Sequence, residues 1–218
     1  MKLKGNELQN NGTVASIDRD NIDTDQIIPT EYLKSIKKFG FEDYLFDGWR
    51  YLDQGKLGIT KDQREINEDF ILNNSPYDEA SILLTRNNFG CGSSREHAVW
   101  ALRDFGIKAV IASSFGDIFY NNCFKNGVLP VILTEDEVDI LFLELEATEG
   151  YELYVNLASQ TVTSDSGQVF NFSLDQFRKQ CLLTGLDEIG LTLIQADKIR
   201  QYEVEREKAH PWVYGAIK

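Results

Sequence analysis

Three short runs of mostly apolar residues mark the clearest elements of the chain. They are Ala80–Thr85, Lys108–Ala112 and Val128–Leu133, each of the length and continuity typical of a strand buried on both faces of a parallel sheet. Pro130 lacks a backbone N–H and therefore favours an edge position or a bulge for the last run. We predict three parallel strands here, the third either at an edge or with a bulge.

Helical periodicity separates these runs. The apolar residues Ala98, Ala101, Leu102 and Phe105 fall at i, i+3, i+4 and i+7, which is one face of a helix, and Gly106 follows as a stop signal. A second helix is predicted over Phe115–Lys125.

A third helix is expected after the last apolar run. Thr134 is followed three residues later by Glu137, the spacing of a capping box, so this helix should begin at Thr134 and end near Gly150. Strands alternating with helices indicate the α/β class.

The N-terminal third is less regular. Gly12–Ile17 is a strand candidate, and Glu31–Lys38 is a candidate short helix. Residues 40–80 are aromatic at first and then polar, so we expect loops and short helices there, as an insertion or flap.

The C-terminal third predicts an antiparallel addition to the sheet. Tyr151–Leu157 alternates as a strand, and residues 160–172 form a hairpin pattern. A helix should begin at Ser173, and Leu191–Lys208 should form one charged amphipathic helix before an exposed tail. The antiparallel strands make the predicted sheet mixed.

Composition narrows the possible functions. The chain has 218 residues, 35 of them acidic and 22 basic, with a formal net charge of −13. Such a surface repels phosphate backbones and anionic lipids, so we expect neither nucleic-acid binding through a basic patch nor membrane association. Apolar runs fall well short of the ~20 residues of a membrane span, and the polar N-terminus lacks a signal-peptide core. We therefore expect a cytoplasmic protein.

The metal-binding side chains are few and scattered. Cys91, Cys123 and Cys181 lie far apart, and His97 and His210 are the two histidines of the sequence. A disulfide framework is not expected, nor is a zinc or iron–sulfur site built from this chain alone, since each needs about four soft ligands.

The strongest candidate for chemistry is the segment Asn88–Ala98, NFGCGSSREHA, between a strand end and a helix start. Gly90 and Gly92 permit a tight turn and a close backbone approach. Free N–H groups at a helix N-terminus attract anions, and Arg95 can hold a carboxylate through two hydrogen bonds. The segment predicts a site for a small carboxylate at the carboxyl end of a parallel strand.

Structural alternatives exist for the same residues. Ser93 and Glu96 have capping-box spacing, and Arg95 could pair with the acidic surface. His97 suits a structural role inside the first helical turn. Cys91 has no histidine near it in sequence except His97, which gives little support to a nucleophile.

Two further polar segments are candidates. In an extended chain Asp23 and Asp25 would share a face and could orient a cation, an arginine or a base; alternatively they form an Asx-type turn. Ser113 and Ser114 follow another strand end, either as a second site loop or as a simple helix N-cap pair.

The motifs together resemble a known family. The segments GCGSSREHA, upstream DTDQIIP and downstream KAVIASSFGDIFYNNCFKNGVLP resemble the small subunits of 3-isopropylmalate dehydratases, which are similar to the swivelling C-terminal domain of aconitase. The resemblance covers most of residues 1–200. It implies a three-layer β/β/α swivelling domain over residues 1–218, with a mixed sheet, a flap or insertion at 40–80 and a helical extension at 190–218.

The resemblance also implies roles for individual residues. Ser94 would be the catalytic base, acting as an alkoxide, and Asp25 would orient polar groups of the active site. Ser93 and Arg95 would bind a substrate carboxylate, and Leu33 would suit an isopropyl group. A [4Fe–4S] cluster would be supplied by a large partner subunit, with no cofactor or metal bound by this chain.

The implied function is a hydro-lyase that interconverts 2-isopropylmalate and 3-isopropylmalate through 2-isopropylmaleate in leucine biosynthesis, active in a heterodimer or heterotetramer with the large subunit. Two alternatives stay open. One is a related hydro-lyase acting on a citraconate-type, homoaconitate or dimethylmalate substrate. The other is a carboxylate-binding module without catalysis.

Overall fold

The computed structural model describes residues 11–185 and 188–214. The chain divides into two compact units, Met1–Gly185 and Leu186–Lys218. Within the described ranges, no helix has the length and apolar character needed to cross a membrane.

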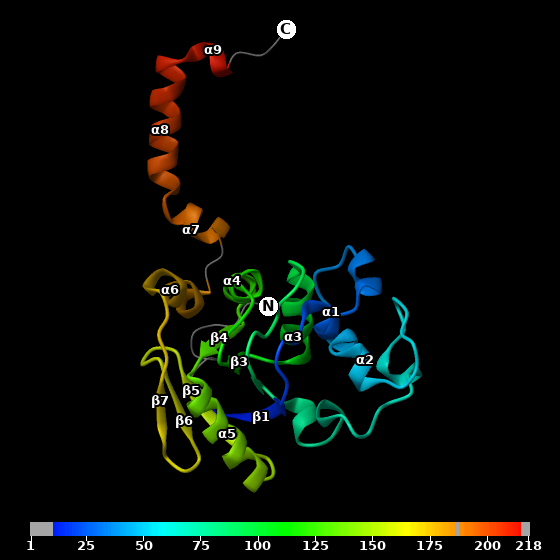
Figure 1. Ribbon diagram of the computed structural model, residues 1–218. Coiled ribbons are helices and arrows are strands. Elements are labelled where there is room, and N and C mark those ends of the chain that lie inside the picture. Colours follow the sequence, from blue (N-terminus) through cyan, green and yellow to red (C-terminus); the bar gives the residue numbers. More distant parts are fainter. Residues whose placement is uncertain (1–10, 186–187, 215–218) are drawn as a thin grey trace. The chain divides into compact units, whose positions relative to one another are not determined.

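A mixed sheet of seven strands organises the first unit (Figure 1). Its spatial order is β4-β3-β2-β1-β5-β6-β7. The strands β1 to β4 are parallel, and β5, β6 and β7 continue the sheet antiparallel from β1. The strands are β1 (Asn11–Ile17), β2 (Ile82–Thr85), β3 (Ala109–Ala112), β4 (Leu129–Ile132), β5 (Glu152–Asn156), β6 (Thr161–Ser164) and β7 (Val169–Asn171).

The α/β class and the mixed sheet are confirmed, as is the edge position of the strand that contains Pro130. Pro130 pairs with Val110 on its inner side, and its missing N–H leaves no gap in a further ladder because β4 ends the sheet.

The helices of the first unit lie mostly in the connections between strands. The α-helices are α1 (Thr24–Ile27), α2 (Asp47–Arg50), α3 (Glu96–Phe105), α4 (Asp117–Asn126), α5 (Glu135–Ala147) and α6 (Gln176–Thr184). Short 3-10 helices are η2 (Thr30–Lys34), η3 (Glu42–Tyr44), η4 (Lys61–Gln63), η5 (Ile71–Asn73) and η6 (Tyr77–Glu79). Residues 40–80 therefore form loops and short helices, as the sequence predicts.

Alternate residues of the parallel strands enter two separate cores. Ala15, Leu83 and Val110 face a core shared with α3, α4 and the 40–80 region. Val14 and Ile111 face a second core shared with α5 and the antiparallel strands. Because successive strand residues point to opposite faces, continuous apolar runs can fill both cores at once.

Helix boundaries follow the predicted end signals with some exceptions. Thr134 caps α5 in a complete capping box, and Gly106 ends α3 in the left-handed conformation, both as predicted. The N-cap of α6 is Asp175, whose side chain accepts from the Arg178 N–H, and the prediction of Ser173 is wrong. The helix predicted from Glu31 ends at Lys34 after one 3-10 turn.

The second unit is helical. It contains α7 (Glu188–Ile194), α8 (Ala196–Ala209) and α9 (Pro211–Tyr214). The single helix predicted over Leu191–Lys208 is thus divided at Gln195, which lies between α7 and α8.

Candidate active site

The loops that follow β1 and β2 run side by side at the carboxyl end of the parallel strands. The Asn21 N–H donates to the Asn87 carbonyl at 2.9 Å, and the Gly90 N–H donates to the Ile22 carbonyl at 2.7 Å. The Thr24 N–H donates to the Cys91 carbonyl at 3.0 Å. This backbone pairing brings together two motifs that lie about 70 residues apart in sequence.

Gly90 is required where this loop passes α4. Its φ is +72°, and an added Cβ would lie 2.2 Å from the Phe119 ring. On the other side, a Cβ on Gly116 would lie 2.6 Å from the Gly90 carbonyl oxygen. The two glycines therefore allow a close approach that no other residue permits.

Asp23 has a local structural role. The segment after it is the short helix α1, and Asp23 caps it: its carboxylate accepts from the Gln26 N–H at 2.8 Å, while the Gln26 side chain accepts from the Asp23 N–H at 2.9 Å. The prediction that Asp23 and Asp25 share a face of an extended chain is wrong, because the chain turns into a helix at Thr24.

Asp25 and Arg95 form an ion pair between the two motifs. Arg95 Nη1 donates to Asp25 Oδ1, and the Thr30 hydroxyl donates to the same oxygen at 2.9 Å. The hydrogen bond from Arg95 holds the pKa of Asp25 below its usual value, although partial burial acts in the opposite direction. The carboxylate is therefore ionised at neutral pH and orients the guanidinium, which has further N–H donors available for a ligand.

The two serines precede Arg95 on an exposed turn. The Thr24 hydroxyl donates to the Ser93 carbonyl at 2.9 Å, which fixes the backbone of the turn against α1. Across the described ranges, the hydroxyls of Ser93 and Ser94 make no hydrogen bond and both residues are exposed. Their hydroxyls are thus available to a ligand.

The N-terminus of α3 lies beside these serines. The N-cap is Arg95, and no side chain caps the helix, so the capping box predicted from Ser93 and Glu96 is wrong. The Glu96 carboxylate instead accepts from the Asn126 side-chain amide at 3.0 Å. An uncapped helix N-terminus next to a guanidinium is an environment that favours an anion.

His97 and Cys91 are poor candidates for catalysis. The ring of His97 lies edge-on to Phe41 with centroids 5.4 Å apart and contacts Trp100, and burial lowers its pKa. Burial raises the pKa of the Cys91 thiol, with a further contribution from the charge of Asp23. A protonated thiol is a weak nucleophile.

Ser114 supports the loop between β2 and α3. Its hydroxyl accepts from the Asn88 N–H at 2.8 Å and donates to Asn87 Oδ1 at 2.5 Å. The N-cap of α4 is Gly116, so the interpretation of Ser113 and Ser114 as an N-cap pair is wrong. Ser114 braces the glycine-rich segment through its side chain.

Leu33 lies on η2 and is half-buried against the core below it. Its segment is connected to the ion pair through Thr30, the first residue of η2. Sequence reasoning did not single out Thr24 and Thr30. The signal that could have found them is the pair of hydroxyl residues that flank Asp25 in TDQIIPT.

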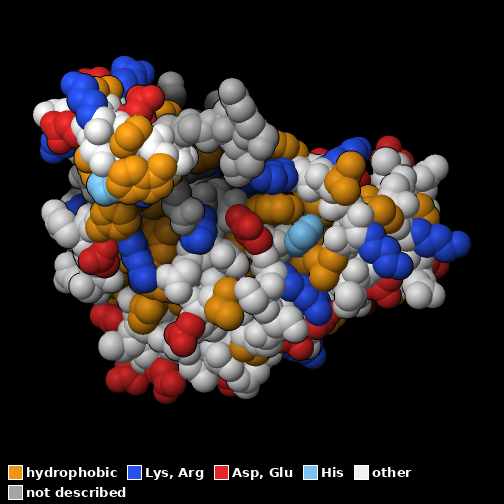
Figure 2. Space-filling view, turned by 90° about the horizontal axis from the view of Figure 1, so that it is seen from above, with side chains coloured by type: hydrophobic (Ala, Val, Ile, Leu, Met, Phe, Trp, Pro, Cys, Tyr) orange, Lys and Arg blue, Asp and Glu red, His pale blue; other side chains and the backbone are white. Residues whose placement is uncertain are grey.

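An acidic depression lies at the same edge of the sheet but apart from the serines. Its volume is about 450 Å³, and the acids Asp18, Asp20, Glu135 and Asp139 line much of it. Arg86 is paired with Asp18 and Asp139. The excess of acids disfavours a dicarboxylate there. Figure 2 shows acidic and basic side chains interspersed on the face that it displays.

Metal ligands do not gather in the parts of the chain that the structure describes. Residues 11–185 and 188–214 contain no group of three or more His, Cys, Asp or Glu side chains that could hold a metal ion. Cys123 is buried in the core, whereas Cys91 and Cys181 are partly exposed. The cysteines of this chain therefore do not fit the ligand set of an iron–sulfur cluster.

Comparisons with known proteins give a consistent result. The family described as the aconitase C-terminal domain matches residues 5–136, LeuD_N matches residues 139–176, and the C-terminal domain of the 3-isopropylmalate dehydratase small subunit matches residues 188–216. A 3-isopropylmalate dehydratase small subunit from Neisseria meningitidis serogroup C is 58% identical over 202 residues, which are 93% of this chain and 95% of that protein. One from Marinobacter nauticus is 58% identical over 207 residues, 95% and 96% of the two chains.

A solved structure shares the fold. The crystal structure of 3-isopropylmalate dehydratase (leuD) from Methanocaldococcus jannaschii aligns with a TM-score of 0.61 and 27% identity, covering 86% of this chain and 98% of that one.

Proposed function

The chain belongs to the family of 3-isopropylmalate dehydratase small subunits, and from this premise we propose that its Asp25–Arg95 pair and adjacent serines form one half of a hydro-lyase active site. A small subunit of this enzyme acts in leucine biosynthesis. The pairing of Arg95 with Asp25 beside two available hydroxyls is the single observation that carries the proposed site.

Arg95 would bind a carboxylate of the substrate. Asp25 engages Nη1 of the guanidinium, so the remaining N–H groups can donate to a ligand in a fixed direction. Removing a proton next to a carboxylate builds negative charge on that carboxylate, so a positioned cation stabilises the transition state more than the ground state. The Ser93 hydroxyl, exposed beside Arg95, would donate to the same group.

Ser94 would take the proton. As an alkoxide, its Oγ would accept a proton from the carbon next to the carboxylate, and the electron pair of the broken C–H bond would form the carbon–carbon double bond. The substrate hydroxyl would leave as water with a proton taken from solvent. Adding water back with the hydroxyl on the other carbon of the double bond would give the isomeric hydroxy acid. The N-terminus of α3 and Arg95 supply positive potential that lowers the cost of the alkoxide.

The rest of the site would belong to a large partner subunit. The proposed assembly is a heterodimer or heterotetramer in the cytoplasm. The iron–sulfur cluster expected in this family would act as a Lewis acid toward the substrate hydroxyl and would be held by the large subunit. The scattered cysteines in the described part of this chain support that division.

Leu33 would contact the isopropyl group of the substrate. It is half-buried, and it lies on the segment joined by Thr30 to Asp25. An apolar side chain at this position suits a branched hydrocarbon better than a third carboxylate, since an unpaired buried carboxylate is costly.

The function is tested by anaerobic reconstitution with the cluster-loaded large subunit of 3-isopropylmalate dehydratase. Absorbance of the unsaturated intermediate reports turnover of 2-isopropylmalate. We expect turnover that requires both chains. Turnover of 2-methylmalate or homocitrate in its place would keep the mechanism and change the substrate, whereas no turnover of any dicarboxylate by a verified complex would favour a binding module without catalysis.

A further inference from the structure

A buried polar cluster joins the segment that bears Leu33 to the 40–80 region, which carries no readable sequence motif. Tyr32 is the one buried residue of η2, with 1% of its surface exposed. Its hydroxyl donates to Asp47 Oδ1 at 2.7 Å. The same oxygen accepts from Arg64 Nη1 at 2.6 Å.

The cluster is enclosed and well paired. The side chains of Arg64 and Asp47 are 2% and 9% exposed, and Arg64 Nε also contacts the Asp53 carboxylate at 3.0 Å. Burial, followed by the hydrogen bond to Asp47, raises the pKa of Tyr32 above its usual value. The hydroxyl therefore stays protonated and donates throughout the physiological pH range.

Packing also fixes the orientation of the Tyr32 ring. It stacks on Tyr44 with centroids 4.0 Å apart and an interplanar angle of 11°. Gly55 covers the junction: a Cβ there would lie 1.7 Å from the Tyr32 hydroxyl oxygen and 2.6 Å from Arg64 Nη1. Backbone thus closes directly over the hydrogen bond, and the tyrosine has no room to take another position.

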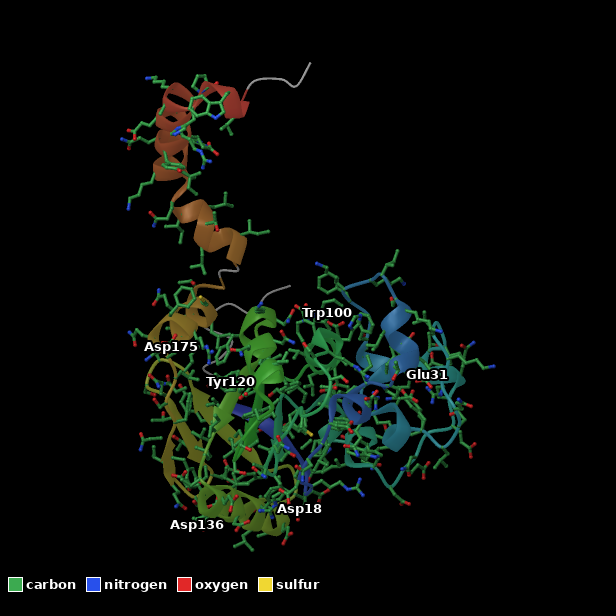
Figure 3. All side chains as sticks on the ribbon, turned by 45° about the horizontal axis from the view of Figure 1, so that its top comes forward. Asp18, Glu31, Trp100, Tyr120, Asp136 and Asp175 are labelled. Carbon is green, nitrogen blue, oxygen red and sulfur yellow. The ribbon has the colours of Figure 1, made fainter. Side chains whose placement is uncertain are left out.

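A buried ion pair contributes little to stability compared with apolar residues of equal volume, because desolvation offsets the attraction. Its hydrogen bonds do impose direction. Here they lock the middle of η2, while Thr30 joins the start of the same turn to Asp25. Figure 3 labels Glu31, the neighbour of Tyr32, among the short helices of this part of the molecule.

We infer that Tyr32, Asp47 and Arg64 are positioning residues that set where Leu33 stands relative to the Asp25–Arg95 pair, and so set the preference for an isopropyl-bearing substrate. The inference rests on the proposed contact of Leu33 with that group. If Leu33 moves away from the isopropyl group, the loss of this hydrophobic contact should lower kcat/KM for the isopropyl-bearing substrate by about one order of magnitude.

The test compares Tyr32→Phe with Tyr44→Phe in the full chain assembled with its cluster-loaded large subunit. Tyr44 is the matched control, since it belongs to the same aromatic stack but its hydroxyl accepts from the Gly58 N–H at 3.0 Å and does not hold η2. The readouts are kcat and KM for 2-isopropylmalate, and the inhibition constant of 2-methylmalate, which has a methyl group in place of the isopropyl group.

For Tyr32→Phe we expect KM to rise about tenfold with kcat within about threefold, and the inhibition constant to change less than about twofold. Tyr44→Phe should leave all three near wild type. An unchanged KM in Tyr32→Phe, or an equal rise of KM and the inhibition constant, would overturn the inference.

Two controls distinguish an effect on η2 from poor assembly and from a wrong proposed function. If Tyr32→Phe assembles poorly, Asp47→Ala, which removes the acceptor of the Tyr32 hydroxyl while Arg64 keeps its ion pair with Asp53, must show the same split between KM and the inhibition constant. Wild-type assemblies inactive on 2-isopropylmalate would refute the proposed function itself, and that measurement is made first.

Discussion

Replacing Asp25 by Asn separates the role of the ion pair in function from its role in stability. The Asp25 carboxylate is 49% exposed and the Arg95 side chain 14%, so solvent screens their attraction. We expect the variant to lose less than about 1 kcal/mol of unfolding free energy. For a chain of this length that is a decrease in Tm of at most about 2–4 °C.

Turnover should fall much further. Without a carboxylate facing Nη1, the guanidinium of Arg95 is free to move, and a carboxylate bound by it is no longer held in one place. We expect kcat/KM for 2-isopropylmalate to decrease about tenfold to a hundredfold in the reconstituted assembly. Calorimetry of the variant and anaerobic turnover measure the two effects on the same preparation.

Asp18→Asn is the matched control. Asp18 is 61% exposed and pairs with Arg86, which makes a comparable ion pair at the same edge of the sheet but away from the serines. It should show a similar small change in Tm with turnover within about twofold. Equal turnover losses in the two variants, or unchanged turnover in Asp25→Asn, would refute the positioning role of Asp25.

Three further predictions follow from local geometry and charge. Gly90→Ala should lower the free energy of unfolding by about 2–4 kcal/mol in urea, because the new Cβ would clash with the Phe119 ring and the positive φ would strain the backbone. Gly106→Ala, with φ +119° and no neighbour within 4 Å, should cost about 1–2 kcal/mol. Equal losses in the two variants would contradict this reasoning. Cys91 should react slowly with iodoacetamide at pH 7.5, because burial raises the pKa of its thiol. Fast alkylation, followed by mass spectrometry, would contradict this burial. The pKa of Asp25 is lowered in the folded state, so its contribution to stability is present above the usual value of 3.8 and is lost as pH falls below it. Between pH 5 and pH 3, the free energy of unfolding of the wild type should therefore fall by up to about 1 kcal/mol more than that of Asp25→Asn.

Strands and most helix ends could be predicted because their signals are local. The continuous apolar runs identify β2, β3 and β4, and the glycine after α3 and the capping box of α5 act within a few residues. Pro130 limits β4 to an edge or a bulge, since a proline removes one ladder hydrogen bond, and the structure shows the edge position.

Capping roles were less predictable because several residues compete for them. Ser93 and Ser173 both have suitable spacing, but the N-cap of α3 is Arg95, without a side-chain cap, and α6 is capped by Asp175. In the first case the backbone of Ser93 is held by Thr24, a residue about 70 positions away. Sequence spacing contains no information on such a tertiary contact.

The candidate site shows the same limit. Ser94 and Arg95 could be chosen from the motif, but the pairing of Arg95 with Asp25 depends on two loops that the sheet brings together. The cluster of Tyr32, Asp47 and Arg64 has no sequence signature, because its members lie 15 and 17 residues apart along the chain.

The most direct test of the account is the turnover of 2-isopropylmalate by the Ser94→Ala assembly under anaerobic conditions, beside Ser93→Ala. If Ser94 is the base, kcat should fall by about 10²–10⁴-fold with a verified cluster and complex, while Ser93→Ala should act mainly on KM. A Ser94→Ala assembly that keeps kcat within about tenfold of wild type would contradict the assignment of the base.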